Sequence, residues 1–265
     1  MNKKIIFTFW EPQENIPQYI RLCMDTWNLY LPEYEIVILD YSNIDKWLGK
    51  KFFDKSLYKY YSLPKQADAI RCAVLEKHGG IWFDADTIII SDEVREFLNI
   101  DSEFVLIGKH IAFIKSCPHS KVTKKWLKGI KRNIFLYKYI KKIKLFNKIV
   151  RKFNRNFYDR RNRWDYLGNS ILNKILENSK LNEFFSIDKI KNCVLPEVVA
   201  FPKEDVQVAY KKFYFENDYS DFVRDHSKGI VLLHNSWTPE EYKNMSKEEF
   251  LLSNNTIAKL LNPKL

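Results

Sequence analysis

The sequence is poor in the features that mark linkers, disulfide frameworks and paired metal ligands. Only seven of its 265 residues are glycine, and no Ser- or Pro-rich tract is present. No linker is therefore evident, and we expect one domain. Its four cysteines lie far apart along the chain, at Cys23, Cys72, Cys117 and Cys193. Such spacing indicates neither a disulfide framework nor a cysteine metal site, and a reducing compartment is the simpler setting.

Long apolar runs are also missing. Near the start of the chain, the run IIFTFW is only six residues long before Glu11 and Pro12 interrupt it. This is shorter than the apolar core of a signal peptide or a membrane span. No other stretch of spanning length is free of charge, so we expect a cytoplasmic protein. The 46% of hydrophobic and 15% of aromatic residues indicate a packed globule rather than a disordered chain.

Acidic residues are almost absent from residues 121–163. This segment holds 17 Lys and Arg and one acid, Asp159, so its own net charge is +16. The whole chain carries +11, and the residues outside the segment therefore sum to −5. Its apolar residues recur every three or four positions, at Leu136, Tyr139 or Ile140, Ile143, Phe146 and Val150. This pattern is typical of a cationic amphipathic helix. Three interpretations remain open: a surface helix packed on the domain, adsorption to anionic lipid, and nucleic-acid binding, which is the least favoured because no binding module is recognisable.

The first forty residues predict a strand, a helix and a second strand, at 3–10, 16–31 and 35–40. This order implies a parallel pair with a right-handed crossover, which begins an α/β sheet. Trp10 falls at the carboxyl end of the first strand, where such sheets collect ligands, although a core tryptophan is equally compatible. Further strands are expected at 103–108, 110–115, 194–201 and 229–234. Further helices are expected at 170–177 and after Pro239.

The stretch from Pro64 to Ser91 carries the strongest chemical signal. Its first part has helical spacing and ends at Gly79 and Gly80, as a helix with a glycine cap would. The residues from Ile81 to Ile90 then have strand composition, interrupted by two aspartates. In an extended chain, Asp84 and Asp86 point to the same side. Two such carboxylates need compensation when buried, and a hard divalent metal is the simplest one.

The preceding helix carries Asp68 and Arg71 one turn apart on one face. Taken alone, this pair is equally compatible with an exposed ion pair. Together with the aspartates, the runs ADAIR and GGIWFDAD resemble the conserved block of nucleotide-sugar-dependent glycosyltransferases with the GT-A fold. The resemblance is greatest to the DXD-containing transferases of family 32 and of capsular polysaccharide synthesis, and clostridial glucosylating toxins share the block.

The resemblance implies a single GT-A domain over residues 1–265. Its fold would be α/β, with a Rossmann-like, mostly parallel sheet flanked by helices and with residues 121–163 as a basic helical insertion. It implies Mn²⁺ or Mg²⁺ as cofactor. By position in the motifs, the resemblance assigns catalysis to Asp84 and Asp86, and metal binding to Asp84, Asp86 and His234. It assigns donor binding to Trp10, Asp68, Arg71, Asp84 and Trp237, and the sugar or acceptor pocket to Gly168 and Asn169.

The implied function is metal-dependent transfer of a hexose, with retention, from a nucleotide-diphosphate sugar, favoured as a UDP-hexose. The expected acceptor is a lipid-linked or lipopolysaccharide glycan in capsule or lipopolysaccharide synthesis. The basic helix would hold the enzyme at the inner face of the cell membrane, and nucleic acid is not an expected partner. Two alternatives remain: an effector that glycosylates a host protein, and a non-enzymatic membrane- or nucleic-acid-binding protein.

Overall fold

The predicted strand–helix–strand opening is present in the computed structural model. Strand β1 (Ile5–Phe9), helix α1 (Gln18–Tyr30) and strand β2 (Glu35–Leu39) follow one another, and β1 and β2 are neighbours in a sheet. Helix α1 packs on β4 (Thr87–Ile89). The Trp27 indole donates a hydrogen bond to the Thr87 carbonyl at 2.8 Å, and the Thr26 hydroxyl accepts one from the Ile89 amide at 2.9 Å. The side chains predicted to face the core on this helix are buried: Ile20, Cys23, Met24, Trp27 and Leu31.

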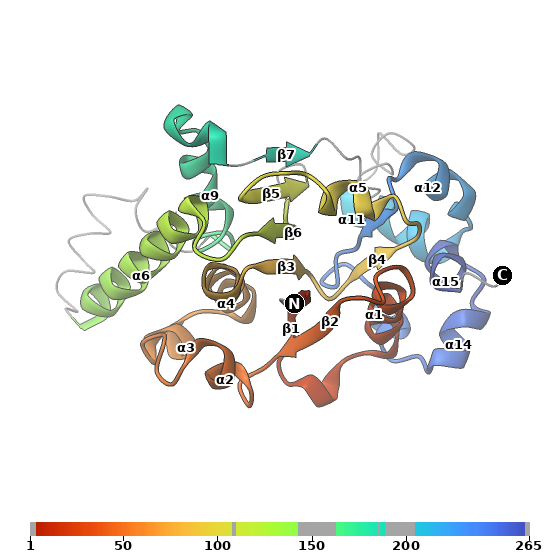
Figure 1. Ribbon diagram of the computed structural model, residues 1–265. Helices are drawn as coiled ribbons and strands as arrows, with labels where there is room; N and C mark the ends of the chain where they lie inside the picture. Colours follow the sequence, from red (N-terminus) through yellow and green to blue (C-terminus); the bar gives the residue numbers. More distant parts are fainter. Residues whose placement is uncertain (1–3, 108–109, 143–162, 185, 189–204, 263–265) are drawn as a thin grey trace. The chain divides into compact units, whose positions relative to one another are not determined.

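The structure describes residues 4–107, 110–142, 163–184, 186–188 and 205–262 (Figure 1). The chain divides into two units, each assembled from separate stretches. The first unit comprises Met1–Ile38, Phe83–Ile100 and Asp188–Leu265, and the second comprises Leu39–Trp82 and Asp101–Ile187. The fold is mixed α/β with a mostly parallel sheet flanked by helices, which confirms the predicted class. The single-domain assignment of residues 1–265 stays a prediction.

The remaining elements of the first unit come mainly from its C-terminal stretch. They are η1 (Gln13–Asn15), α5 (Val94–Leu98), α11 (Val206–Lys211), η3 (Lys212–Glu216), α12 (Ser220–His226), β8 (Ile230–Leu232), α13 (Glu240–Lys243), α14 (Lys247–Leu252) and α15 (Thr256–Leu261). The predicted strand near residue 230 and the predicted helix after Pro239 are thus confirmed, whereas the strand predicted at 194–201 lies outside the described residues.

The second unit contains four strands in the order β3-β6-β5-β7. Its elements are α2 (Ile44–Leu48), α3 (Ser56–Tyr60), α4 (Leu63–His78), β3 (Gly80–Phe83), β5 (Phe104–Ile107), β6 (His110–Ser116), α6 (Lys121–Lys142), α9 (Asn169–Leu176), η2 (Ser179–Phe184) and β7 (Ser186–Asp188). The predicted strand pair is confirmed as the antiparallel β5–β6 pair, in which Phe104 lies opposite Ser116. Helix α4 ends at Gly79, where φ is +66° and a Cβ would lie 2.6 Å from Pro118 Cδ, so glycine is required there.

The prediction of one continuous strand from Ile81 to Ile90 is wrong. Strand β3 ends at Phe83, and Asp84, Ala85 and Asp86 form a turn that leads into β4. The Thr87 amide closes this turn on the Asp84 carbonyl at 3.0 Å. Two adjacent carboxylates are costly inside a sheet, and aspartate favours turns. As a result, Ala85 is buried and both aspartates are half-buried, at the junction of two strands rather than along one.

Helix α6 runs beside α4 in the second unit (Figure 1). Its first half buries Val122, Trp126 and Ile130, and the Trp126 indole donates a hydrogen bond to the Leu167 carbonyl at 2.8 Å. Of the apolar stripe predicted farther along, Leu136 and Tyr139 are exposed. The predicted positions Ile143, Phe146 and Val150 lie outside the described residues. Within the described part of the chain, no helix is both long and apolar enough to span a membrane.

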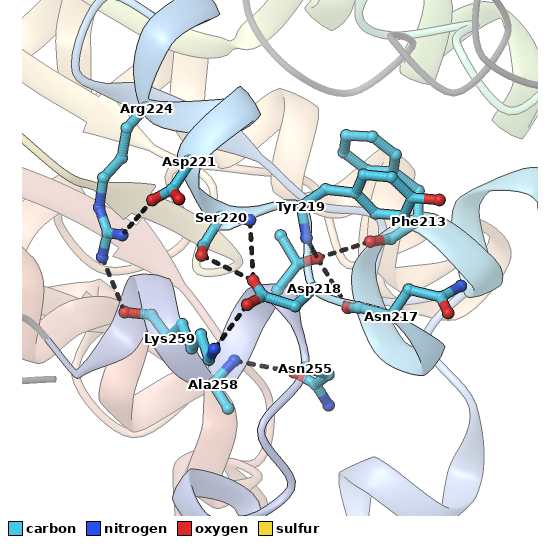
Figure 2. A network of polar contacts seen from close by, with 11 residues as sticks. Phe213, Asn217, Asp218, Tyr219, Ser220, Asp221, Arg224, Asn255, Ala258 and Lys259 are labelled. Carbon is cyan, nitrogen blue, oxygen red and sulfur yellow. Dashed lines mark hydrogen bonds and ion pairs between the residues drawn. The ribbon is translucent and has the colours of Figure 1, made fainter.

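A polar network closes the C-terminal part of the first unit (Figure 2). The Asp218 carboxylate accepts hydrogen bonds from the Ser220 amide at 3.0 Å and hydroxyl at 2.7 Å, and pairs with Lys259 at 2.5 Å. The Tyr219 amide donates to the Thr256 hydroxyl at 2.8 Å. These contacts tie α12 and α15 to the segment that follows α11 and η3.

Burial tends to raise the pKa of Asp218, but the hydrogen bonds from Lys259 and Ser220 outweigh it and lower the pKa from 3.8 to about 2. A lowered pKa stabilises the fold above pH 3.8, and that stabilisation disappears as the pH falls through about 2. Because the side chain is 38% exposed, we expect Asp218→Asn to cost only about 1 kcal/mol of unfolding free energy at pH 7. The difference from the wild type should vanish near pH 2, as followed by urea unfolding. Asp221→Asn is the matched control. Asp221 is 99% exposed and its ion pair with Arg224 is long at 3.8 Å, so this variant should cost less than Asp218→Asn.

Candidate functional site

The Asp86 carboxylate is bound by a loop that lies far along the chain. The Asn235 amide donates a hydrogen bond to Asp86 Oδ2 at 2.8 Å, across 149 positions of sequence. The Leu233 amide also donates to the Asp86 carbonyl at 3.2 Å. Antiparallel pairing of β4 with β8 brings these groups together, with Thr87 opposite Leu232. The structure therefore joins two predicted site segments, the DXD turn and the loop that begins at His234.

Two buried tyrosines form hydrogen bonds with the loop that begins at His234. The Tyr19 hydroxyl donates a hydrogen bond to Asn235 Oδ1, and the Tyr210 hydroxyl accepts one from the His234 amide at 3.0 Å. Burial, and then the nearby Asp86 charge, raise the pKa of Tyr19 well above its ordinary value. Burial likewise raises the pKa of Tyr210. Both hydroxyls therefore keep their protons throughout the physiological range.

The loop from His234 to Thr238 carries two half-buried rings, and the His234 carbonyl closes its turn. The His234 ring lies 4.2 Å from the Trp237 ring, and both rings are near Tyr210. The His234 carbonyl accepts hydrogen bonds from the amides of Trp237 at 2.8 Å and Thr238 at 3.1 Å. These contacts set a compact turn in which His234 and Trp237 remain partly accessible.

The predicted metal ligands do not form a complete protein cage. Among the described residues, no group of three or more His, Cys, Asp and Glu side chains is arranged to hold a metal ion. Mg²⁺ in nucleotide sites is commonly held by one or two carboxylates and completed by substrate phosphates and water. The half-buried carboxylates of Asp84 and Asp86 suit that kind of incomplete site. Metal binding by Asp84, Asp86 and His234 stays a prediction.

Asp68 and Arg71 are buried in the second unit, each only 4% exposed. The interpretation as an exposed ion pair is therefore wrong. Their charged groups lie 3.7 Å apart, and Arg71 Nη1 donates a hydrogen bond to the Ile111 carbonyl at 2.7 Å. The guanidinium carbon also lies 4.9 Å from the centre of the Trp82 ring. Arg71 thus ties α4 to β6 and β3 and holds Asp68 in a defined position.

Gly168 lies directly against Asp68. A Cβ at Gly168 would overlap Asp68 Oδ2 and would come within 2.7 Å of Ile111 Cδ1. The next residue, Asn169, begins α9, and its buried Oδ1 has no hydrogen-bond partner among the described residues. A buried amide oxygen is usually hydrogen-bonded, so Asn169 Oδ1 has the capacity to accept a further hydrogen bond. The structure therefore joins the predicted donor residue Asp68 to the predicted sugar pocket.

Trp10 directly follows β1, as predicted, and is half-buried. Its partial exposure distinguishes it from Trp27, Trp82 and Trp126, which are fully buried. The sequence did not reveal the supporting groups Tyr19, Tyr210 and Asn235. Tyr19 has the helical spacing of a core residue, and the Asn235 contact uses its backbone amide, which any residue but proline supplies.

The sequence matches the family of capsular polysaccharide synthesis proteins over residues 1–198. The chain belongs to this family. Membership confirms the capsular-polysaccharide type of the predicted resemblance. A comparison with curated protein sequences finds no match.

Two solved structures are similar to this family member at low identity. One, described as PaToxG Glycosyltransferase, is 15% identical with a TM-score of 0.39, over 99% of this chain and 87% of that chain. The other is described as the apo-form glycosyltransferase GlyE in Streptococcus pneumoniae TIGR4. It is 14% identical with a TM-score of 0.44, over 99% of this chain but only 63% of that chain, less than two thirds of its length. Both likenesses are remote, so the family assignment depends on the sequence match alone.

We expect Tyr19→Phe to lower the unfolding free energy by about 1 kcal/mol, because Asn235 Oδ1 loses a buried donor. Hydrogen exchange at the Asn235 amide should accelerate, since the loop is then held by fewer contacts. Tyr30→Phe, in the last turn of the same helix, is the control, because its hydroxyl forms no hydrogen bond with the described residues. Equal stability and equal exchange in the two variants would contradict a supporting role for Tyr19.

Proposed function

We propose that this protein is a metal-dependent glycosyltransferase of capsule or lipopolysaccharide synthesis. It transfers a hexose, with retention, from a nucleotide-diphosphate sugar, favoured as a UDP-hexose, to a lipid-linked glycan. The observation that carries the proposal is the contact between the DXD turn and the C-terminal loop, in which the Asn235 amide holds the Asp86 carboxylate. Family membership supports the same conclusion, because capsule synthesis requires sugars to be joined.

The candidate residues for the metal and the diphosphate all belong to the first unit. Asp86 and His234 would hold Mn²⁺ or Mg²⁺, with Asp84 beside them, since carboxylate oxygens suit hard cations and an imidazole favours Mn²⁺. When bound, the metal would neutralise charge on the leaving diphosphate. Asn235 keeps the Asp86 carboxylate oriented, and Trp10 and Trp237 offer half-buried aromatic faces for the nucleotide.

The candidate sugar-binding residues all belong to the second unit. Asp68 is a buried acceptor for sugar hydroxyls, held in place by Arg71. Asn169 adds a buried amide oxygen that can accept one further hydroxyl hydrogen bond. Gly168 allows the backbone to approach Asp68 closely, because a side chain at this position would overlap the carboxylate.

We expect Asp86→Asn to lower sugar transfer by at least about a hundredfold, because it removes one charged ligand and its electrostatic stabilisation. Nucleotide release from UDP-hexoses, measured with Mn²⁺ and then with EDTA, tests this expectation. The control is Asp225→Asn, which neutralises an exposed acid of the same unit. Full activity of Asp86→Asn, or full activity in EDTA, would refute the metal-dependent mechanism.

Gly168→Ala should lower transfer by about a hundredfold, because the new methyl group displaces Asp68 and a shift of about 1 Å in a positioning group has an effect of that order. The fold should persist, as circular dichroism would show. Ser170→Ala, two residues farther along, is the matched control and should retain activity. If Gly168→Ala kept its kcat and KM for the donor, Asp68 would not belong to the sugar pocket.

A further inference from the structure

Helix α6 presents a face without acidic residues to solvent. The helix contains nine Lys and Arg and no Asp or Glu. Its exposed cations belong mainly to the first three turns: Lys121, Lys124, Lys125, Lys128, Lys131 and Arg132. We call the solvent-facing side of residues 121–139 the α6 outer face.

The same face becomes apolar one turn farther on. Phe135 is 57% exposed, Leu136 is 41% exposed and Tyr139 is 54% exposed. The rings of Phe135 and Tyr139 lie 4.7 Å apart, as expected for neighbours four residues apart on a helix. A cluster of three large apolar side chains in water, flanked by cations, marks an interaction surface rather than a solvated one.

Packing on the opposite side prevents the helix from turning this face inward. Trp126 and Ile134 are buried, and the Trp126 indole is bonded to Leu167. Near the exposed cluster, Tyr137 lies against the rings of Tyr60 and Tyr61, at 5.6 and 5.1 Å. The interpretation in which the apolar stripe packs on the domain is therefore wrong for Leu136 and Tyr139.

We propose that the α6 outer face docks on an anionic phospholipid bilayer, with Phe135, Leu136 and Tyr139 entering the interface and the cations contacting lipid phosphates. Amphipathic helices of this composition lie in the plane of the interface. The charge is complementary to anionic lipid, and no acid on the helix opposes it. This inference is independent of the proposed function, because it uses none of the site residues.

Two other occupants fit the observations less well. Single-stranded nucleic acid would use the cations and stack on the aromatic rings, but it has no use for the exposed Leu136. A second copy of the chain, paired through the same face, would bring two sets of cations together without an intervening acid. Both occupants are outcomes that the experiment distinguishes.

The experiment measures co-sedimentation with vesicles of phosphatidylcholine containing phosphatidylglycerol, and with vesicles of pure phosphatidylcholine. We expect binding only to the anionic vesicles, weakened by salt. The variant Lys124→Gln/Lys128→Gln/Arg132→Gln should reduce the partition coefficient by about a hundredfold, at about fivefold per cation. The control is Lys50→Gln/Lys174→Gln/Lys180→Gln, which removes the same charge from exposed lysines outside α6 and should bind as the wild type does.

A second variant, Phe135→Ser/Leu136→Ser/Tyr139→Ser, tests the apolar part. It should weaken vesicle binding at least about tenfold while leaving the salt dependence unchanged, because the cations remain. Circular dichroism would verify that all variants are folded. The proposal is overturned by wild-type binding in either α6 variant, by equal binding to both vesicle types, or by binding of poly(U) without binding of vesicles. It is also overturned if light scattering shows a dimer that the serine variant dissociates.

Discussion

A half-buried carboxylate beside a strand needs a hydrogen-bond donor, and in this protein Asn235 supplies it. Its amide reaches Asp86 only because β8 pairs with β4 in one register, with Thr87 opposite Leu232. A one-residue slip would turn every side chain of the strand to the other face and would move the amide away from the carboxylate. The geometry of the DXD turn is therefore a consequence of strand pairing across most of the chain's length.

In the second unit, the buried carboxylate of Asp68 is compensated by a charged side chain instead of a backbone amide. A buried Asp68 would be costly alone, but Arg71 lies 3.7 Å away, and Arg71 Nη1 in turn donates a hydrogen bond to the Ile111 carbonyl. Removing either partner leaves a buried charge without compensation. The absence of a side chain at Gly168 then lets α9 approach the carboxylate. Packing and charge balance thus hold the Asp68 carboxylate directly against the backbone at Gly168.

Local patterns in the sequence predicted the longer helices α1, α4, α6 and α9 and most of the strands, because helical spacing and β-branched runs report burial directly. The short helices α2, α3, α5, α11, α12 and α15 were not predicted. The turn at Asp84–Asp86 was predicted as extended strand, since apolar residues on both sides hide the break. Asp68, Arg71 and His234 were recognisable by motif; Asp68 and Arg71 are buried and His234 is half-buried, while their roles stay predictions. The contact between Gly168 and Asp68, and the role of Tyr19, depend on tertiary packing between distant segments, which no local pattern records.

The charge on α6 is not explained by the stability of the helix. Lys121 and Lys125, Lys124 and Lys128, and Lys128 and Arg132 are like-charge neighbours four residues apart, an arrangement that destabilises a helix by a few tenths of a kcal/mol per pair. Mixed charges would solvate the same face without this cost. The buried side, with Trp126 at its centre, already anchors the helix. The excess of cations is therefore not explained by helix stability, and the proposed docking on anionic lipid is an explanation that does not depend on it.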